Sequence, residues 1–354
     1  METMIDIPVI KTKHSTIGEV DWNNLVFGQH VSDHMFIATY KDGEWQDPQI
    51  IPYQNISLPP TALALHYGQS VFEGMKAFRT VDGGINIFRM ERHFDRLNRS
   101  MDRMCMPQLP FDLFEAALRQ LVQVDAEWVP AGEDVALYLR PIVFASEGKM
   151  GVKVSDEYTF MVLTGPVPTL YQNPIKVKVE REYIRAAKGG TGYAKCAGNY
   201  GGAFYPTQIA RKEGFDQVLW TDAFEHEYIE ESGTMNLMFV LDGKLVTAPV
   251  SDSILDGVTR DSLLELAESL GIKTEERRIS VTELVSAIES GKKIEAFGAG
   301  TAAVVAPIQT IGVDGELYNI PAYDASSVMY CLKRELEAIR TGAKEDGFGW
   351  NVIL

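Results

Sequence analysis

The stretch KGGTGYAKCAGNYGGAF, residues 188–204, places one lysine, Lys195, in a run of glycines and small residues. Glycine loops bring backbone close to an anion, so a lysine inside one contacts a phosphate or is itself a reacting amine. The small neighbours leave room for a planar group, and a partly desolvated lysine can act as a nucleophile and form an imine. The alternative is an exposed loop lysine, the commoner state of an isolated lysine. The rest of the chain has to decide between these readings.

Composition narrows the class of protein. The 354 residues carry 49 acidic and 33 basic side chains, a formal net charge of −16, which disfavours nonspecific binding to nucleic acid or anionic membranes. Cys105, Cys196 and Cys331 have no CxxC spacing, so we expect neither a disulfide framework nor a structural metal site. The N-terminal segment resembles no targeting signal, and no run of about 18 apolar residues occurs. We therefore expect a cytoplasmic protein without nucleic-acid, membrane or metal partners.

The chain length suits two domains. Residues 165–174, GPVPTLYQNP, concentrate prolines between two strand-like runs, which is typical of a linker. We expect a smaller N-terminal domain of residues 1–168, a linker of residues 169–174, and a larger strand-rich domain of residues 175–354 that carries the lysine. The fold class is α/β, mixed with α+β character.

The spacing of apolar residues along the chain predicts the positions of helices and strands. In the first half we expect strands at 36–40, 85–90, 134–145 and 157–166 and helices at 91–104 and 111–124. In the second half we expect strands at 175–186 and 216–222, a hairpin at 234–250 that turns at Asp242-Gly243, and a helix at 259–271.

Two adjacent carboxylates, Glu230 and Glu231, precede Ser232-Gly233-Thr234 and an apolar strand. A pyridinium nitrogen needs a fixed anion beside it to stay protonated and act as an electron sink, and either glutamate qualifies on chemistry. A solvated acidic loop explains the pair equally well.

Two further elements are of the kind that binds phosphate. Val258 and Thr259 open the helix at 259–271, where free N–H groups and a partial positive charge attract anions. The turn FGAGTAA, residues 297–303, adds Thr301 among glycines. Each signal is weak alone, because Thr259 also suits an ordinary helix cap and most such glycine turns are plain connections.

Basic residues recur on the predicted helix at 91–104. Arg92, Arg96, Arg99 and Arg103 fall three or four residues apart and share one face. Most should pair with nearby carboxylates, but a single one turned inward would suit a phosphate dianion. The helical spacing alone does not show which of the four arginines is turned inward.

Tyr138 and Arg140, in YLRP, are two residues apart on a predicted strand and so share one face. A hydroxyl and a guanidinium together can hold a carboxylate. A half-exposed pair at a sheet edge is an equally good explanation.

In their order and spacing these strings resemble one family. HYGQSVFEGMKAFR at 66–79, the arginine helix, YLRP, GGTGYAKCAGNYG, EESGTMN, DGVTR and FGAGTAA resemble the branched-chain amino-acid aminotransferases. These are pyridoxal-phosphate enzymes of fold type IV, also called class IV aminotransferases. The similarity runs from about Trp22 to Pro307.

The resemblance implies roles around pyridoxal 5'-phosphate. Lys195 is expected to hold the cofactor as an imine and to move the substrate proton, and Glu231, rather than Glu230, is expected to pair with the pyridine nitrogen. Tyr200 is expected to hydrogen-bond the phenolic oxygen. The phosphate is expected to be bound by Arg96, Val258, Thr259 and Thr301.

Substrate contacts also follow from the resemblance. Aromatic rings are expected to contact the branched side chain, and Arg140 is expected to bind the second carboxylate of glutamate. The glycine turn at 297–303 is expected to donate backbone hydrogen bonds to the α-carboxylate. The residues concerned are Tyr67, Phe72, Tyr138, Arg140, Gly300, Thr301 and Ala302. A phenylalanine of the family is replaced here by Val31, and Leu170 and Tyr171 compete for the position of a tyrosine that gates the family's site.

The resemblance implies transamination between L-leucine, L-isoleucine or L-valine and 2-oxoglutarate by a ping-pong cycle, in a homodimer whose partners are small amino acids and 2-oxo acids. A D-amino-acid aminotransferase or an aminodeoxychorismate lyase of the same fold is the near alternative. A non-catalytic protein that binds the cofactor or a phosphate ligand is the alternative from another class, because fold alone does not settle function.

Overall fold

The computed structural model describes residues 5–171 and 173–354. It divides into two compact units, each taken here by itself. The first holds residues up to Pro168 with Ala194–Gly198 and Ile339–Leu354, and the second holds Thr169–Tyr193 and Asn199–Ala338. Lys195 thus groups with the first unit, whereas the expected division placed it with residues 175–354. The expected linker includes residue 172, which lies outside the described residues, and its bounds stay a prediction.

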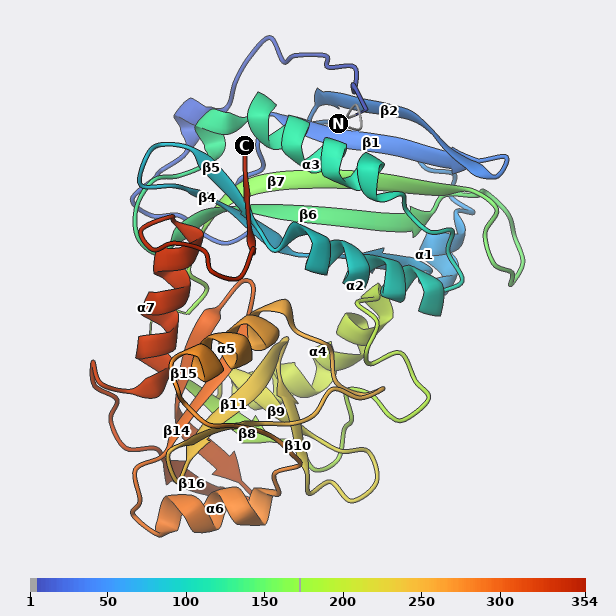
Figure 1. The fold of residues 1–354 in the computed structure, drawn as a ribbon. Helices are drawn as coiled ribbons and strands as arrows, with labels where there is room; N and C mark the ends of the chain where they lie inside the picture. Colours follow the sequence, from blue (N-terminus) through green and yellow to red (C-terminus); the bar gives the residue numbers. More distant parts are fainter. Residues whose placement is uncertain (1–4, 172) are drawn as a thin grey trace. The chain divides into compact units, whose positions relative to one another are not determined.

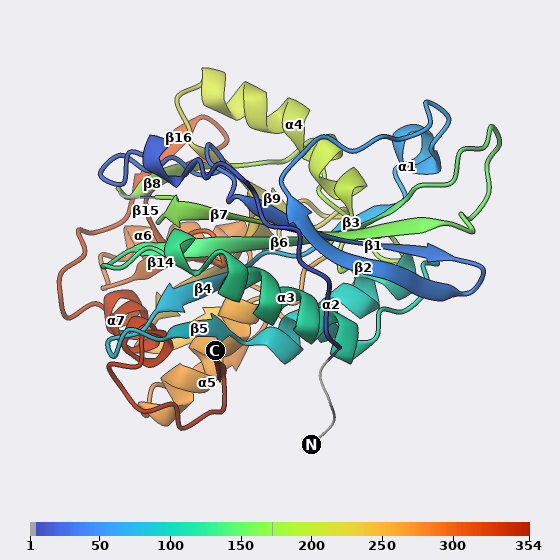
Figure 2. The same cartoon turned by 90° about the horizontal axis from the view of Figure 1, so that it is seen from above.

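The first unit is built on an antiparallel sheet with strand order β17-β5-β4-β6-β7-β1-β2 and with β3 paired to β6 (Figure 1). Figure 2 shows β1 and β2 side by side at one edge of this sheet. The strands are β1 (His34–Lys41), β2 (Glu44–Pro52), β3 (Ser70–Phe72), β4 (Met75–Arg79), β5 (Ile85–Phe88), β6 (Val135–Ala145), β7 (Tyr158–Pro168) and β17 (Asn351–Ile353).

Helices α1 (Leu63–Tyr67), α2 (Met90–Arg103) and α3 (Phe111–Val124) belong to the same unit. Helix α3 contacts β1 and β7. Its buried side chains recur at helical spacing and are Leu113, Phe114, Ala116, Ala117, Leu118, Leu121 and Val122. Burying one large apolar side chain of this kind contributes roughly 1.5–3 kcal/mol, so this face holds the helix to the sheet.

The second unit is built on a strand ring. Strands pair in the order β10-β9-β8-β15-β14-β11, and β11 pairs with β10 again, which closes the ring. The strands are β8 (Ile175–Val179), β9 (Gln217–Thr221), β10 (Ile229–Ser232), β11 (Met235–Leu241), β12 (Lys244–Thr247), β13 (Thr274–Glu276), β14 (Glu295–Gly300), β15 (Val304–Val313) and β16 (Glu316–Asn319).

The remaining helices are α4 (Ala197–Lys212), α5 (Val258–Ser269), α6 (Val281–Glu289) and α7 (Val328–Arg340). Helix α6 begins with a local cap, because the Ser280 hydroxyl accepts the N–H of Glu283 at 2.9 Å. In the part of the chain that the structure describes, no helix is long and apolar enough to cross a membrane. The same residues contain no group of three or more His, Cys, Asp or Glu placed to hold a metal ion.

Several predicted elements are confirmed. The helix at 111–124 has the predicted bounds, and the hairpin turns at Asp242 and Gly243, both in the left-handed region at φ 48° and 76°. The strand predicted at 175–186 is wrong beyond Val179, where β8 ends. No helix or strand is predicted from the sequence for residues 188–204, where α4 begins at Ala197.

Candidate active site

Lys195 is fixed by its backbone on both sides. Its N–H donates to the Ser100 hydroxyl at 2.9 Å, and its carbonyl accepts the N–H of Phe72 at 3.0 Å. The next residue, Cys196, is buried, and its backbone forms an isolated antiparallel β-bridge with Val71. The Lys195 side chain is half-buried, with Nζ 5.0 Å from the centre of the Phe72 ring. This lysine is therefore a positioned group and not a fully exposed loop side chain.

Among the arginines of α2, Arg96 is the one that turns inward, with 4% of its surface exposed. The buried carboxylate of Glu73 accepts hydrogen bonds from Arg96 Nε at 2.7 Å and from Arg96 Nη2 at 2.8 Å. The same carboxylate accepts His93 Nδ1 at 2.8 Å. The Ser100 hydroxyl, which supports Lys195, donates to the Arg96 carbonyl at 2.9 Å. One helix thus positions both a guanidinium and the lysine backbone.

Charge within this cluster follows from the contacts. Burial alone would raise the pKa of Glu73, but the Arg96 guanidinium and then His93 hold that pKa far below its usual range. Burial lowers the pKa of His93, which outweighs the attraction of Glu73. The cluster is therefore an ionised Glu73, a cationic Arg96 and a neutral His93 at neutral pH.

Tyr138 and Arg140 lie on one face of β6, as alternation along a strand predicts. Arg140 Nη2 donates to the Tyr138 hydroxyl at 3.0 Å, and its guanidinium lies 4.7 Å from the centre of the Phe72 ring. Phe27 packs edge-on against Tyr138 with ring centres 5.1 Å apart. Sequence reasoning considered Val31 and missed Phe27, which supplies the aromatic contact.

Arg140 Nε is buried and has no hydrogen-bond partner within the residues that the structure describes. A buried donor without an acceptor costs free energy, so this atom suits an anionic group of a ligand. Tyr67, at the end of α1, is 44% exposed. The first unit thus brings together Lys195, Arg96, Phe72, Tyr138 and Arg140.

In the second unit Glu231 is 3% exposed and surrounded by donors. Arg185 Nε lies 3.0 Å from Oε2, and Oε1 accepts the Leu255 N–H at 2.6 Å and Asn236 Nδ2 at 3.4 Å. Hydrogen bonds to the ionised form keep a carboxylate charged. The neighbouring Glu230 lies at a register irregularity of β10 and bonds elsewhere, to Ser253. Of the two glutamates, Glu231 is therefore the fixed anion; sequence reasoning missed Arg185.

Helix α5 begins beside this carboxylate. Its N-cap is Gly257, where an added Cβ would lie 1.9 Å from Asn236 Oδ1, so only glycine allows this close approach. Val258 and Thr259 form the first turn and are buried. The first N–H groups of a helix have no partner inside it, so this terminus offers donors and positive potential.

The turn at 301–303 joins β14 to β15. Strand register aligns Glu231 with Asn236, and Asn236 with Ala299, so the turn after Gly300 lies at the same end of the ring as Glu231. Val304 has φ 58°, a strained conformation for a β-branched residue, and such strain is often found at functional sites. The Leu170 N–H donates to the Ala302 carbonyl at 3.4 Å.

Two residues named from the sequence are held by local contacts. Tyr200 lies in the first turn of α4, where its neighbour Asn199 accepts the Thr191 hydroxyl at 2.7 Å. The Tyr171 hydroxyl accepts Gln217 Nε2 at 2.9 Å, and burial raises the pKa of Tyr171. Tyr171 is thus anchored on β9, while Leu170 contacts the turn at 301–303.

The family model named Amino-transferase class IV matches residues 70–311. Branched-chain-amino-acid aminotransferase 2 of Bacillus subtilis is 42% identical over 93% of this chain and 92% of its own. Branched-chain-amino-acid transaminase 1 of the same organism is 43% identical over 94% of this chain and 95% of its own.

Solved structures give the same result. The branched-chain amino acid aminotransferase from Escherichia coli superposes with a TM-score of 0.73 at 28% identity, covering 90% of this chain and 98% of that chain. The branched-chain amino acid aminotransferase of T.th., solved with N-(5'-phosphopyridoxyl)-L-glutamate, has a TM-score of 0.72 at 27% identity, with 89% and 97% covered. The α/β fold expected from the resemblance is thus confirmed.

Proposed function

The chain belongs to the class IV aminotransferases, and from this premise we propose that it transfers an amino group between L-leucine, L-isoleucine or L-valine and 2-oxoglutarate. The products are the branched-chain 2-oxo acid and L-glutamate. The observation that carries the proposal is the fixed backbone of Lys195, held between Ser100 and Phe72.

We propose pyridoxal 5'-phosphate as the cofactor. The residues fit it in two ways: Glu231 is held by hydrogen bonds from the Leu255 N–H and Asn236 and by an ion pair with Arg185, and α5 begins beside it with N–H groups that have no partner inside the helix. When bound, the cofactor supplies an electron sink that weakens the Cα–H bond of the substrate. The residues proposed to hold it are Arg96, Lys195, Tyr200, Glu231, Val258, Thr259 and Thr301.

In the mechanism, Lys195 Nζ accepts the proton from the substrate Cα, and the Phe72 ring beside it limits access of water. Arg96, oriented by Glu73 through two hydrogen bonds, presents a fixed cation to the phosphate. Arg185 and the Leu255 N–H keep Glu231 charged and in place.

Two substrates must share one pocket, an apolar amino acid and a dicarboxylate, so the site needs apolar surface and one polar end. Arg140, beside Phe72 and Tyr138, is proposed as that polar end. Substrate contacts are proposed for Tyr67, Phe72, Tyr138, Arg140, Gly300, Thr301 and Ala302.

Arg140→Met is expected to raise KM for 2-oxoglutarate by about 10- to 100-fold, because a charge-assisted hydrogen bond contributes about 1.5–3 kcal/mol. KM for L-leucine is expected to change much less. Steady-state kinetics with each substrate varied measures both values. Arg119→Met, on the surface of α3, is the matched control. An equal rise for both substrates would remove the assignment of Arg140 to the second carboxylate.

Gly74→Ala is expected to lower kcat/KM for L-glutamate at least about tenfold, since displacing Tyr138 loses a hydrogen bond of the ligand pocket. An added Cβ would lie 2.0 Å from the Tyr138 hydroxyl, which has to move away from Arg140. Gly18→Ala, where the Cβ meets nothing within 4 Å, is the control. Unchanged glutamate kinetics in Gly74→Ala would show that the position of Tyr138 is unimportant.

The function itself is tested by a product assay with purified protein, L-leucine and 2-oxoglutarate. We expect L-glutamate in equal amount to the branched-chain oxo acid, and parallel double-reciprocal plots for the ping-pong cycle. D-leucine is expected to give no product. Preferred turnover of D-leucine would instead favour a D-amino-acid aminotransferase, and pyruvate release from aminodeoxychorismate would favour the lyase.

We further propose a cytoplasmic homodimer. The cysteines Cys105, Cys196 and Cys331 are all free thiols, which suits a reducing compartment. The exposed Tyr67 ring suits a contact with a second copy. Light scattering of the purified protein tests the assembly, and a monomer mass at assay concentration would contradict it.

A further inference from the structure

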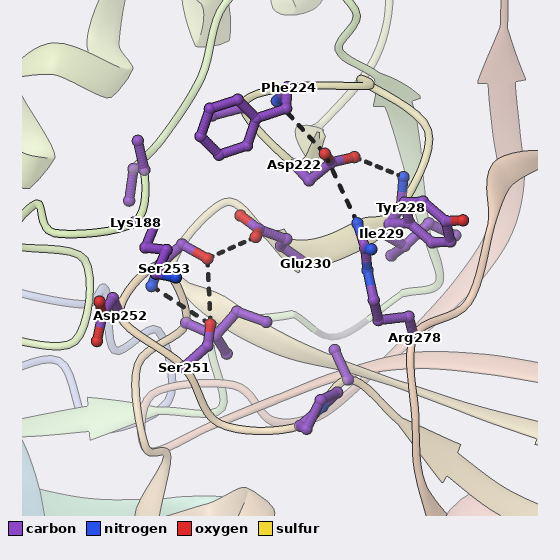
Figure 3. A pocket seen from close by; sticks show the side chains of 16 residues that line it. Lys188, Asp222, Phe224, Tyr228, Ile229, Glu230, Ser251, Asp252, Ser253 and Arg278 are labelled. Carbon is purple, nitrogen blue, oxygen red and sulfur yellow. Dashed lines mark hydrogen bonds and ion pairs between the residues drawn. The ribbon is translucent and has the colours of Figure 1, made fainter.

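A cavity of about 410 Å³ lies in the second unit (Figure 3). We call it the Glu230 cavity. Its apolar lining comes from three chain segments and includes Phe224, Ile229, Pro249 and Ile254. Small-molecule sites in proteins typically span about 300–1,000 Å³, with mostly apolar walls and a few polar groups. The cavity has both the size and the composition of such a site.

Glu230 supplies the main polar group of this cavity. Its Oε1 accepts the hydroxyl of Ser253, and Figure 3 shows this contact, together with the bond between Ser253 and Ser251. Its Oε2 is buried and has no hydrogen-bond partner in residues 5–171 and 173–354. Burial raises the pKa of Glu230, so ionisation of this carboxyl is costly without a donor. A ligand donor at Oε2 would remove that cost.

Positive charge lies on two other sides of the cavity. The Arg278 guanidinium stacks 3.4 Å from the centre of the Tyr228 ring and lies 3.7 Å from Asp222. Lys188 belongs to the glycine loop and is exposed. Asp222 and Asp252 also line the cavity, which therefore offers an acceptor, an apolar middle and a rim of mixed charge with Lys188 and Arg278 as its cations.

We propose that the Glu230 cavity binds a small apolar amino acid as a zwitterion, as a second ligand site in addition to the active site. The ammonium group donates to Glu230 Oε2, the side chain contacts Phe224 and Ile229, and the carboxylate faces Lys188. A simple amine could pair only with Glu230 and a simple carboxylate only with Lys188, whereas a zwitterion can pair with both. The proposal does not depend on the reaction that Lys195 carries out.

The cavity is connected to Glu231 through one short loop. Ser253 contacts Glu230 by its hydroxyl, and its carbonyl accepts Arg185 Nη2. Two residues on, the Leu255 N–H donates to Glu231 Oε1, and Arg185 Nε lies beside Oε2. A ligand that favours one position of this loop therefore also acts on the anion of the active site. Occupancy is expected to change kcat several-fold.

The test uses the holoenzyme and 2-aminoisobutyric acid, an apolar amino acid that lacks the Cα proton and cannot be transaminated. Titration calorimetry, and tryptophan fluorescence of Phe224→Trp, both report its binding. We expect saturable binding that Glu230→Gln weakens at least tenfold. Glu182→Gln, an exposed glutamate of the second unit outside the cavity lining, is the control and is expected to leave binding unchanged.

Two shortened probes separate the ends of the ligand. Isobutyrate lacks the ammonium group and isopropylamine lacks the carboxylate, and each is expected to bind at least tenfold more weakly. Without the probe, Glu230→Gln is expected to keep L-leucine turnover within about twofold, because the glutamine amide oxygen can still accept the Ser253 hydroxyl and keep the loop in place. That result separates a failed cavity proposal from a failed aminotransferase proposal. Equal binding of 2-aminoisobutyric acid to the parent and Glu230→Gln, or no binding to either, would overturn the proposal.

Discussion

Lys195→Ala is expected to lower turnover of L-leucine with 2-oxoglutarate at least about 10³-fold, because one amine both holds the cofactor and moves the substrate proton. The fold is expected to survive, since the anchors of this residue are its backbone N–H and carbonyl, which alanine keeps. Turnover, the melting temperature and bound cofactor are measured on the same preparation.

Lys212→Ala, on the exposed end of α4, serves as the control for general loss of a lysine. Added methylamine is expected to restore part of the activity of Lys195→Ala, because a free amine can replace the missing proton acceptor. Normal turnover in Lys195→Ala would contradict the mechanism outright and leave a protein that binds the cofactor without using this lysine.

Glu73→Gln is expected to cost about 3–5 kcal/mol of unfolding free energy, because it leaves the buried Arg96 charge without its partner. It is also expected to weaken cofactor retention, since two hydrogen bonds that orient Arg96 come from this carboxylate. Urea unfolding and the rate of cofactor loss on dilution measure the two effects. Asp95→Asn, exposed on α2, the helix that carries Arg96, is the control.

The pH dependence of this prediction follows from the lowered pKa of Glu73. A carboxyl whose folded-state pKa is depressed stabilises the protein above its unfolded pKa of about 4.5, and this contribution falls as acid protonates it. The difference between the parent and Glu73→Gln is therefore expected to be constant at about pH 6–8 and to shrink below about pH 4. A difference that grows on acidification would show that Glu73 is protonated in the folded state.

The sequence predicted correctly those helices and turns that are determined by residues close together in the chain. The apolar spacing of Phe111–Val124 and the Asp242-Gly243 turn are such cases. The strand predicted through residue 186 failed because the Glu180 carboxylate accepts the N–H groups of Glu182 and Tyr183, which turns the chain. Closure of the ring by β10 and β11 depends on pairings across the whole unit, which periodicity does not contain.

In the candidate site too, local sequence patterns predicted some features, while others depend on contacts between residues far apart in the chain. Periodicity put four arginines on one helix face but could not select Arg96, whose burial depends on Glu73, 23 residues earlier. A charged residue inside the apolar run VFEGM was the available signal for Glu73. Nothing local distinguished Glu231 from Glu230; the resemblance chose Glu231, and the contact with Arg185 gives that choice a physical reason.

The most direct test of the central claim is the visible absorption spectrum of the purified protein with pyridoxal 5'-phosphate, before and after L-leucine and then 2-oxoglutarate. The account predicts a yellow band that bleaches with L-leucine, does not bleach with D-leucine, and returns with the oxo acid. A protein that stays colourless with the cofactor, or a band that L-leucine leaves unchanged, would contradict the assignment of Lys195 and the reaction proposed for this chain.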